Sequence, residues 1–406
     1  MTAAPLAPPA FFTPEFFHDP HPSFDALRDL APATRVLGPS GNRIWVIPGY
    51  EDARTALTHP DVRKDEWRRP ELRDRHQVEP ELRREVDVRI RHNMINADPP
   101  EHQRLRHRTQ QALSPARADA LRPRLARLAD LHLDALAAAG PGPVDLRGAF
   151  GYPFALAVVT ELLGLREDEQ RDFRSWFQTL MVHRSARAVR EVSAEIADYA
   201  EAVVDRRLAR PTGDLICALA ADRDGHAALD RSELASTVFL LLIAGAETAN
   251  AVANGTLALL RHPEQLAALR ADRSLLPGAI EETLRYEGSF RAVGPRYTDR
   301  PVRFGELTVP EGEFLLIALQ AANRDPHRFR DPHRFDITRA DRQHLGMGYG
   351  AHRCVGSKIA YAQLEIVHER LLDRFPRMRP AVAAEEIRRQ PSMTMNWLES
   401  LPVTLW

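Results

Sequence analysis

Helical periodicity dominates the middle of the chain. From residue 101 to residue 285, apolar side chains recur every three or four positions, a spacing that places them on one face of a helix. Breaks are expected where turn-forming residues gather, at 140–143, 211–213 and 222–225. The pattern therefore predicts a series of consecutive helices joined by short connections.

One of these helices has clear ends. Asp230 and Glu233 have the spacing of a capping box, an apolar run follows, and Pro263 ends the helix. A helix of this length, rising 1.5 Å per residue, would cross a whole domain. Its longest apolar stretch, Val238–Ala246, is too short to span a bilayer, which needs ~20 apolar residues.

The regions on either side have different patterns. Arg35–Ile47 predicts two short strands around a Pro-Ser-Gly-Asn turn. Residues 61–91 are dense in charge and broken by prolines, so a solvated, partly helical excursion is expected. Short strands and turns are predicted from 286 to 350, followed by one more helix from Gly356 to about Arg374. The predicted fold class is mainly α, with a helical body and a minor β-rich portion.

Composition and charge narrow the possible functions. The 406 residues include 55 Lys and Arg and 56 Asp and Glu, so the net charge is −1 and offers no general attraction to nucleic acid or to an acidic membrane. No linker or repeat divides the chain, and residues 1–406 are expected to form one domain. The Pro-rich segment 1–22 lacks the features of a signal peptide. Because only two cysteines occur, a cytoplasmic protein is expected.

The strongest chemical signal surrounds Cys354. In His344-Leu-Gly-Met-Gly-Tyr-Gly-Ala-His-Arg-Cys-Val-Gly356, glycines at alternate positions prevent a regular helix or strand and allow close backbone approach. Cys354 follows this loop at the start of a predicted helix, where backbone N–H groups and the helix dipole favour a thiolate, the form that binds a metal. The alternative is a buried structural cysteine. Cys217, in an apolar helical run, is expected to have no functional role.

This loop resembles the heme-binding signature of the cytochrome P-450 family, F-G-x-G-x-H-x-C-x-G, with the matching residues Gly348, Gly350, His352, Cys354 and Gly356. Met347 stands where the family usually has Phe, and methionine can fill the same space. The resemblance implies heme b (iron protoporphyrin IX) as the cofactor, Cys354 as the ligand of its iron, and Gly348 as part of the cofactor-binding loop.

A second match concerns a structural group of charges. Glu282-Thr-Leu-Arg285 matches the family's E-x-x-R element, whose spacing puts both side chains on one face of a helix. In the family a third charge comes from a downstream D-P-x-R-F segment, which here is Asp331–Phe335 and implies Arg334. The alternative is an ordinary surface pair.

Four residues are implied as partners of the two heme propionates. Asp98 is expected to cap a helix on which His102 and Arg106 lie one turn apart, an arrangement similar to the family's D-P-P-x-H-x-x-x-R element. Arg296 matches a propionate-binding arginine of the family, and His352 comes from the cysteine loop. A buried dianion needs several cationic or N–H partners, and separate segments can supply them.

Ala244-Gly-Ala-Glu-Thr248 resembles the family's A-G-x-[DE]-T element for oxygen activation. The resemblance implies that Ala244 borders the heme and that Gly245 leaves room for a diatomic ligand. Thr248 is expected to bend the helix by bonding the carbonyl four residues back and to donate a hydrogen bond to dioxygen, while Glu247 relays protons. The alternative is a helix–helix contact at Gly245 and a solvated Glu247.

Together these matches imply a heme-thiolate oxidoreductase that activates dioxygen to hydroxylate or otherwise oxidise a small organic substrate, such as a natural-product intermediate. Within enzymes the alternative is oxidative coupling of aromatic substrates without oxygen insertion. Outside enzymes the alternative is a heme-based ligand sensor, which would need neither Thr248 nor a proton route.

The family topology also implies a substrate pocket and a partner. The residues expected near the substrate are Trp67, Ile243, Phe290, Val293, Met393 and Met395, with the segment 177–183 as a roof. Electrons are expected from a separate ferredoxin or flavodoxin system. Its docking surface is predicted to be a basic patch of Arg104, Arg108, Arg353 and Lys358. No binding to nucleic acid or membrane is expected.

Overall fold

The computed structural model describes residues 11–166, 173–182, 185–221 and 228–406. The predicted break at 222–225, the end of the expected roof at His183 and residues 1–10 of the Pro-rich segment lie outside these ranges.

The helices are α1 (Pro14–His18), α2 (His21–Leu30), α3 (Tyr50–Thr58), α4 (Pro70–His76), α5 (Glu101–Ala112), α6 (Pro115–Ala137), α7 (Tyr152–Leu163), α8 (Phe173–Met181), α9 (Ala186–Ala209), α10 (Leu215–Ala220), α11 (Arg231–Ala246), α12 (Thr248–Arg261), α13 (Pro263–Ala271), α14 (Leu276–Tyr286), α15 (Leu319–Ala322) and α16 (Ser357–Arg374).

Strands and short turns of helix complete the chain. The strands are β1 (Thr34–Leu37), β2 (Arg43–Ile47), β3 (Val62–Arg63), β4 (Val144–Asp145), β5 (Val293–Thr298), β6 (Val302–Phe304), β7 (Leu307–Val309), β8 (Phe314–Ile317), β9 (Arg379–Pro380) and β10 (Pro402–Thr404). Single turns are η1 (Glu66–Arg68), η2 (Pro80–Leu82), η3 (Val88–Ile90), η6 (Arg273–Leu275), η7 (Gly350–His352) and η8 (Ala384–Glu386), and η4 (Arg147–Gly151) is a π-helix. The predicted mainly α class with a minor β portion is confirmed.

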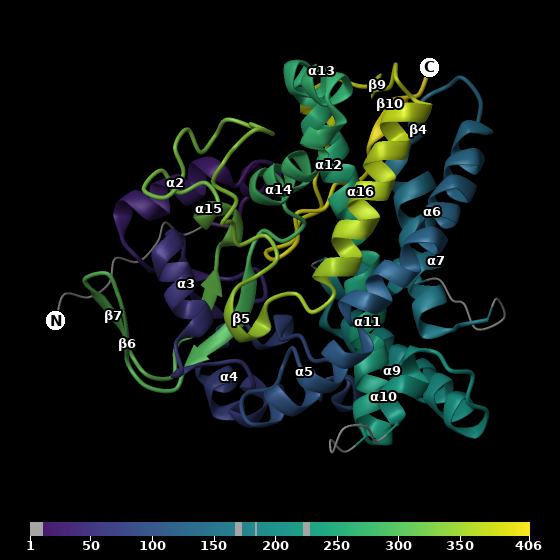
Figure 1. The fold of residues 1–406 in the computed structure, drawn as a ribbon. Helices are drawn as coiled ribbons and strands as arrows, with labels where there is room; N and C mark the ends of the chain where they lie inside the picture. Colours follow the sequence, from purple (N-terminus) through teal and green to yellow (C-terminus); the bar gives the residue numbers. More distant parts are fainter. Residues whose placement is uncertain (1–10, 167–172, 183–184, 222–227) are drawn as a thin grey trace.

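Long helices form one side of the molecule and the main sheet lies on the other (Figure 1). α16 packs along α6, α11 packs between α7 and α9, and α12 contacts α16. The predicted capping box begins α11, where the Asp230 carboxylate accepts from the Glu233 N–H at 2.9 Å. The helix is interrupted at Glu247 and continues as α12. The stretch Arg231–Arg261 is long and apolar enough to cross a membrane, but 72% of its most apolar window is buried inside the protein, as in a core helix.

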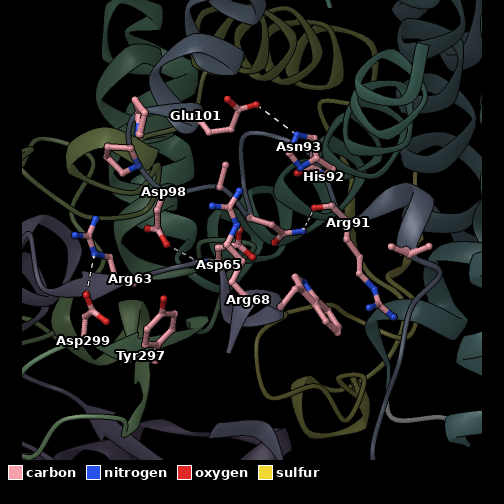
Figure 2. A pocket seen from close by; sticks show the side chains of 16 residues that line it. Arg63, Asp65, Arg68, Arg91, His92, Asn93, Asp98, Glu101, Tyr297 and Asp299 are labelled. Atoms are coloured by element: carbon pink, nitrogen blue, oxygen red, sulfur yellow. Dashed lines mark hydrogen bonds and ion pairs between the residues drawn. The ribbon is translucent and has the colours of Figure 1, made fainter. Parts of the chain in front are cut away.

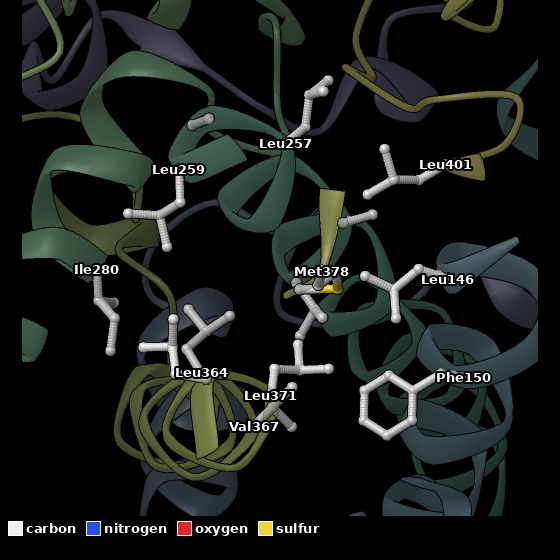
Figure 3. Close-up of a cluster of buried hydrophobic side chains, with 14 of the residues drawn as sticks. Leu146, Phe150, Leu257, Leu259, Ile280, Leu364, Val367, Leu371, Met378 and Leu401 are labelled. Atoms are coloured by element: carbon white, nitrogen blue, oxygen red, sulfur yellow. The ribbon is translucent and has the colours of Figure 1, made fainter. Parts of the chain in front are cut away.

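A large apolar core joins these helices (Figure 3). Leu257 and Leu259 of α12 meet Leu364 and Leu371 of α16, and Phe150 of η4 packs on the other side. Burial of each such side chain contributes about 1.5–3 kcal/mol relative to its exposed state. This core fixes α12 and α16 relative to each other. It therefore also fixes Thr248, the first residue of α12, relative to Cys354, which lies just before α16.

The main sheet has five strands in the order β1-β2-β8-β5-β3. The predicted hairpin is confirmed, because β1 and β2 pair antiparallel with Thr34 opposite Val46. β5 changes register between Val293 and Arg296, an irregularity that re-aims side chains locally. The charged excursion at 61–91 is partly helical as predicted, but Leu72 and Ile90 are buried, so it is less solvated than expected.

Candidate active site

The loop before α16 is held in an unusual backbone path. Gly348 and Gly350 have φ angles of 72° and 70°, which favour glycine. The Gly348 N–H donates to the carbonyl of Leu345 and the Cys354 N–H to the carbonyl of Met347, both at 2.8 Å. These bonds close the loop and leave Cys354 at its end, just before Ser357 begins α16.

Cys354 is exposed, yet burial raises the pKa of its thiol. The two observations agree if the sulfur faces an enclosed space rather than bulk solvent. The Gly356 N–H and the charges of Arg106 and Arg353 lower its pKa, as the sequence predicted, but burial outweighs them. The expected N–H contribution to a thiolate is therefore present at Gly356, but burial of the sulfur opposes it. A coordinating metal ion would supply the missing charge, because it deprotonates a thiol outright.

Five cationic or imidazole side chains converge beside this loop: Lys64, His102, Arg106, Arg296 and His352. The rings of His102 and His352 lie 4.1 Å apart, and neither ring nitrogen of the buried His102 has a hydrogen-bond partner. Burial and the neighbouring Arg296, His102, Lys64 and Arg106 lower the pKa of His352 to about 2. Within the described residues, none of the five forms an ion pair with a carboxylate. We call this set the cation cluster.

Lys64 and Arg296 of the cation cluster are brought together by the pairing of β3 with β5 in the main sheet. Arg63 of β3 pairs with Tyr297 of β5, so the next residue, Lys64, lies beside Arg296. The Lys64 ammonium donates to the carbonyl of Pro295 at 3.2 Å. Burial and the charge of Arg296 lower the pKa of Lys64 to about 8, and burial lowers that of Arg296 to about 10. Sequence analysis missed Lys64, because no motif contains it and only the pairing of β3 with β5 reveals it.

Asp98 does not cap α5, contrary to the prediction. The residue before the helix is Pro100, which has no side-chain cap. The Asp98 carboxylate instead accepts from the backbone N–H groups of Lys64, at 3.0 Å, and Asp65, at 3.0 Å. It therefore ties the start of α5 to the segment that carries Lys64. On α5 itself, Arg106 donates to the carbonyl of Arg353 at 2.7 Å and so links the helix to the cysteine loop.

Ala244 is exposed in the middle of a core helix, and this exposure indicates an internal space beside α11. Gly245 faces the other way, where an added Cβ would collide with the Val159 side chain of α7. Helix packing, which was the alternative, is therefore sufficient to require the glycine. Thr248 is buried, and no hydrogen bond to the carbonyl of Ala244 is found in the described part of the chain. The predicted bend occurs at Glu247, whose own N–H donates to that carbonyl at 3.3 Å.

Glu247 is half-buried and its carboxylate is bonded within the protein, so the alternative of a solvated surface side chain is wrong. Its Oε2 accepts from the indole N–H of Trp397 at 3.0 Å and from the Asn250 amide at 3.4 Å. Burial raises the pKa of its carboxyl to about 7, although Trp397, Asn250 and the charge of Arg147 lower it. At neutral pH this carboxyl can both hold and release a proton, which suits a general acid or base.

The E-x-x-R pair forms as predicted but its third member differs. Arg285 donates to both oxygens of Glu282, at 2.7 and 2.8 Å, and both side chains are buried. The third charge is Arg339, whose Nε lies 3.1 Å from Glu282 Oε2. Arg334 is exposed and contributes only its backbone carbonyl, which accepts from Arg285 at 3.0 Å. The implied role of Arg334 is therefore wrong. The meander after Asp331 turns far enough that Arg339 reaches the pair instead.

Comparison with known proteins agrees with this geometry. The family model for cytochrome P-450 matches residues 42–396. The chain belongs to the cytochrome P-450 family. It is 39% identical over 404 residues to cytochrome P-450 107B1 of Saccharopolyspora erythraea, covering 99% of each chain, and 37% identical to the cytochrome P-450 monooxygenase PikC of Streptomyces venezuelae, covering 96% of this chain and 92% of PikC. The tirandamycin C-bound P-450 monooxygenase TamI superposes with a TM-score of 0.88 at 36% identity, covering 97% of this chain and 99% of TamI.

The protein is therefore a cytochrome P-450 monooxygenase, whose cofactor is heme and which uses dioxygen to oxidise a small organic molecule. The residues of this chain fit such a cofactor. Cys354 and Ala244 are both exposed, so both surfaces are accessible to a bound cofactor. The cation cluster forms no ion pair with a carboxylate among the described residues, so its Lys64, Arg106 and Arg296 charges are available to the two carboxylates of protoporphyrin IX.

The residues expected near the substrate of this P-450 divide into two groups. Phe290 and Met395 form a β-bridge, and Ile243 packs in the same apolar cluster. Val293 and Met393 pack against two neighbouring clusters. Trp67 lies apart from them, with the guanidinium groups of Arg73 and Arg91 over its ring at 4.1 and 3.9 Å.

Trp67 also lines a surface cavity of about 470 Å³ that Figure 2 shows. The other side chains of this cavity are largely charged, among them Arg63, Asp65, Asp98 and Glu101. This lining differs from the apolar surroundings of Phe290 and Met395. Trp67 is thus not brought together with the other residues of the predicted substrate pocket.

The predicted docking patch of this P-450 is wrong for Arg108, and ion pairs offset the charge of the partly exposed Arg104. Arg108 is buried, where it donates to the carbonyl of Ala221 and to the Gln111 side chain at 3.1 Å. Arg104 forms ion pairs with Glu101, at 2.6 Å, and with Glu233, so its charge is neutralised. Arg353 and Lys358 are exposed, as predicted.

Proposed function

We propose that this P-450 hydroxylates or otherwise oxidises a natural-product intermediate. The observation that carries the proposal is the meeting of the Cys354 loop with the cation cluster, whose members are buried or half-buried and form no ion pair with a carboxylate among the described residues. That arrangement has no structural purpose by itself, because buried like charges repel. The relatives support the substrate class, since TamI is bound to tirandamycin C and others are named as a pentalenic acid synthase and a 6-deoxyerythronolide B hydroxylase.

The cation cluster and the cysteine loop would hold the cofactor. We assign the Cys354 thiolate as the iron ligand, with Gly348 and Ala244 bordering the porphyrin. Lys64, His102, Arg106, Arg296 and His352 would share the two propionates, and each contact would relieve repulsion within the cluster. When bound, heme supplies the iron that activates dioxygen, and thiolate donation assists cleavage of the oxygen–oxygen bond.

Glu247 and Thr248 would deliver protons on the opposite side of the internal space. The Glu247 carboxyl holds a proton near neutral pH because burial disfavours its charge. Thr248 follows it directly at the break between α11 and α12, where its hydroxyl makes no hydrogen bond within the described residues. A positioned proton donor of this kind contributes about 10²–10⁴-fold to the step that it serves.

The substrate would lie against the apolar side chains near this break: Ile243, Phe290, Val293, Met393 and Met395. Trp67 is a weaker candidate, because two arginines cover its ring. Electrons would come from a separate ferredoxin or flavodoxin in the cytoplasm, with Arg353 and Lys358 on the docking surface. Residues 1–406 would act as one catalytic unit.

Product mass tests the reaction type. A natural-product library is first screened for compounds that change the spin state of the iron, and hits are then incubated with reductant, a ferredoxin system and oxygen-18 gas. A gain of one labelled oxygen atom is expected. Loss of hydrogens without label would indicate coupling, which the named monooxygenase relatives do not favour, and no turnover of any hit with any reductant would indicate a sensor.

A further inference from the structure

Glu247 is a half-buried residue whose carboxyl makes all its hydrogen bonds through one oxygen. Oε2 accepts from the Trp397 indole at 3.0 Å and from Asn250 Nδ2 at 3.4 Å. No hydrogen bond to Oε1 and no ion pair to either oxygen occurs among the described residues. The carboxyl is therefore anchored on one side and open on the other.

The orientation of the Asn250 amide is fixed by a third residue. Arg147 Nε donates to Asn250 Oδ1 at 2.8 Å, and because an arginine can only donate, that atom must be the amide oxygen. The amide nitrogen is then the atom that faces Glu247. Arg147 is itself buried and held by the Tyr152 hydroxyl at 2.6 Å and the carbonyl of Glu399 at 3.2 Å. Asn250 therefore acts as a donor to Glu247, not as an acceptor.

Trp397 is equally well fixed. It is one of the largest fully buried side chains, and the N–H of its neighbour Asn396 donates to the carbonyl of Ser289, in the segment after α14, at 2.8 Å. Asn254 of α12 donates to the carbonyl of Asn396 at 2.9 Å. The segment that carries the indole donor and the helix that follows Glu247 are thus joined by the Asn254 side chain, and their relative position does not depend on the Glu247 bond.

We propose that Trp397 and Asn250 are positioning residues that dock Oε2 of Glu247, so that the transferable proton is carried on Oε1. An oxygen that accepts two N–H donors has no room for a proton of its own, because the O–H would point at one of those hydrogens. The inference rests on the proposed role of Glu247 as a proton relay. It adds which oxygen carries the proton and which residues decide this.

The same contacts set the pH range in which the proton is available. Burial raises the pKa of Glu247 to about 7, and the donors Trp397 and Asn250 and the charge of Arg147 lower it by stabilising the ionised form. Tyr152 and Arg174 lie behind Arg147 in the same charge network. Removal of either donor therefore raises the pKa of Glu247, and the carboxyl then stays protonated to higher pH.

Trp397→Phe tests the proposal, because phenylalanine keeps an apolar ring but lacks the N–H. The holoenzyme, labelled with carbon-13 at the glutamate carboxyl, is studied in its diamagnetic ferrous–CO form by NMR, and the Glu247 signal is assigned from its loss in Glu247→Gln. The titration midpoint of Glu247 is expected to rise by about one pH unit, the size of one charge-assisted hydrogen bond. The pH profile of product formed per reductant should move in the same direction.

Trp45→Phe is the matched control. The Trp45 indole also donates to a buried glutamate, Glu313 Oε2 at 2.9 Å, but in the main sheet. Its loss should leave the Glu247 midpoint unchanged. If Trp397→Phe fails to incorporate heme, the test is made with Asn250→Ala. The titration midpoint of Glu247 should then rise by a smaller amount, because the contact of Asn250 to Glu247 is longer.

An unchanged midpoint in the folded donor variant would overturn the proposal. A midpoint that moves, combined with a normal product yield in Glu247→Gln, would keep Trp397 and Asn250 as positioning residues. That result would instead refute the relay role assigned to Glu247 under the proposed function.

Discussion

Buried charge takes two different forms in this protein. Around Glu282 every charge has a partner: Arg285 binds both carboxylate oxygens, and Arg339 adds a third contact at 3.1 Å. In the cation cluster, by contrast, Arg296, Lys64 and His352 form no ion pair with a carboxylate among the described residues. The charge of Arg296 lowers the pKa of Lys64, and both cations lower the pKa of His352. The difference separates charges that hold the chain together from charges that are left open for a ligand.

The paired charges around Glu282 and the cation cluster should respond differently when one charged side chain is removed. Breaking a closed buried pair leaves an uncompensated charge, which costs about 3–5 kcal/mol. Removing one cation from an open cluster relieves repulsion but removes a contact to the ligand that the cluster binds. The predictions below test this contrast, from the largest expected effect to the smallest.

Arg285→Met should have the largest effect. It leaves the buried Glu282 with Arg339 as its remaining cation and the Asp336 N–H as a neutral donor, and the free energy of unfolding should fall by about 3–5 kcal/mol. Heme incorporation should fail with it. Urea unfolding and heme content measure both. Arg334→Ala is the control, since its side chain is exposed and the third charge is Arg339. An equal loss of stability and heme content in Arg334→Ala would show that Arg334, and not Arg339, is the third charge beside Glu282 and Arg285.

Thr248→Ala should leave folding and heme content unaltered but reduce product formation. If its hydroxyl helps to deliver protons, the step it serves should slow by up to about 10²–10⁴-fold, and reduced oxygen should leave as hydrogen peroxide. Product and peroxide per reductant consumed are measured in parent and variant. Unchanged coupling would remove Thr248 from the mechanism, and loss of substrate binding would show that it shapes the pocket instead.

Arg296→Met should change the apoprotein and the holoprotein in opposite directions. The apoprotein should become more stable by about 1 kcal/mol, because a buried cation with no carboxylate partner is replaced by an apolar side chain of similar length. Heme should dissociate several-fold faster, as measured by its transfer to an acceptor apoprotein. Lys64→Met should behave likewise. If both the apoprotein and the holoprotein became less stable, Arg296 would be a paired structural charge like those around Glu282. That result would contradict the distinction between the Glu282 group and the cation cluster.

Charge reversal at Arg353 and Lys358 should have the smallest effect. Both are exposed, so their replacement by Glu should slow reduction by ferredoxin by only a few-fold, and less at high salt. Arg187→Glu on α9, also exposed, is the control. Reduction rates that match the parent at every salt concentration would exclude this surface as the docking site.

Short-range spacing predicted the elements of the site well. The Cys354 loop, the Glu282–Arg285 pair and the helix interruption at Glu247 each depend on residues within a few positions of one another, where helix and turn geometry set the distances. Sequence alone could not choose Arg339 over Arg334, because the path of a meander is set by distant packing. Lys64 was missed for a similar reason, since it reaches the cluster only through pairing of β3 with β5.

Helix faces were predicted less well than helix positions. Arg108 shares α5 with His102, and the spacing indicated an outward side chain, but α10 covers that face and its carbonyls accept from Arg108. Gly245 was similarly predicted to leave room for a ligand, and the structure shows that it packs against Val159. Which side of a helix is covered depends on its neighbours in space, and the spacing of residues along one chain does not contain that information.

The central claim is that Cys354 provides the thiolate ligand of the heme iron. The most direct test is the absorption spectrum of the ferrous–CO complex in the parent protein and in Cys354→His, with Cys217→Ala as the control. The parent and Cys217→Ala should show the red-shifted Soret band of a thiolate-ligated heme. Cys354→His should bind heme but lack that band. Survival of the band in Cys354→His would contradict the claim.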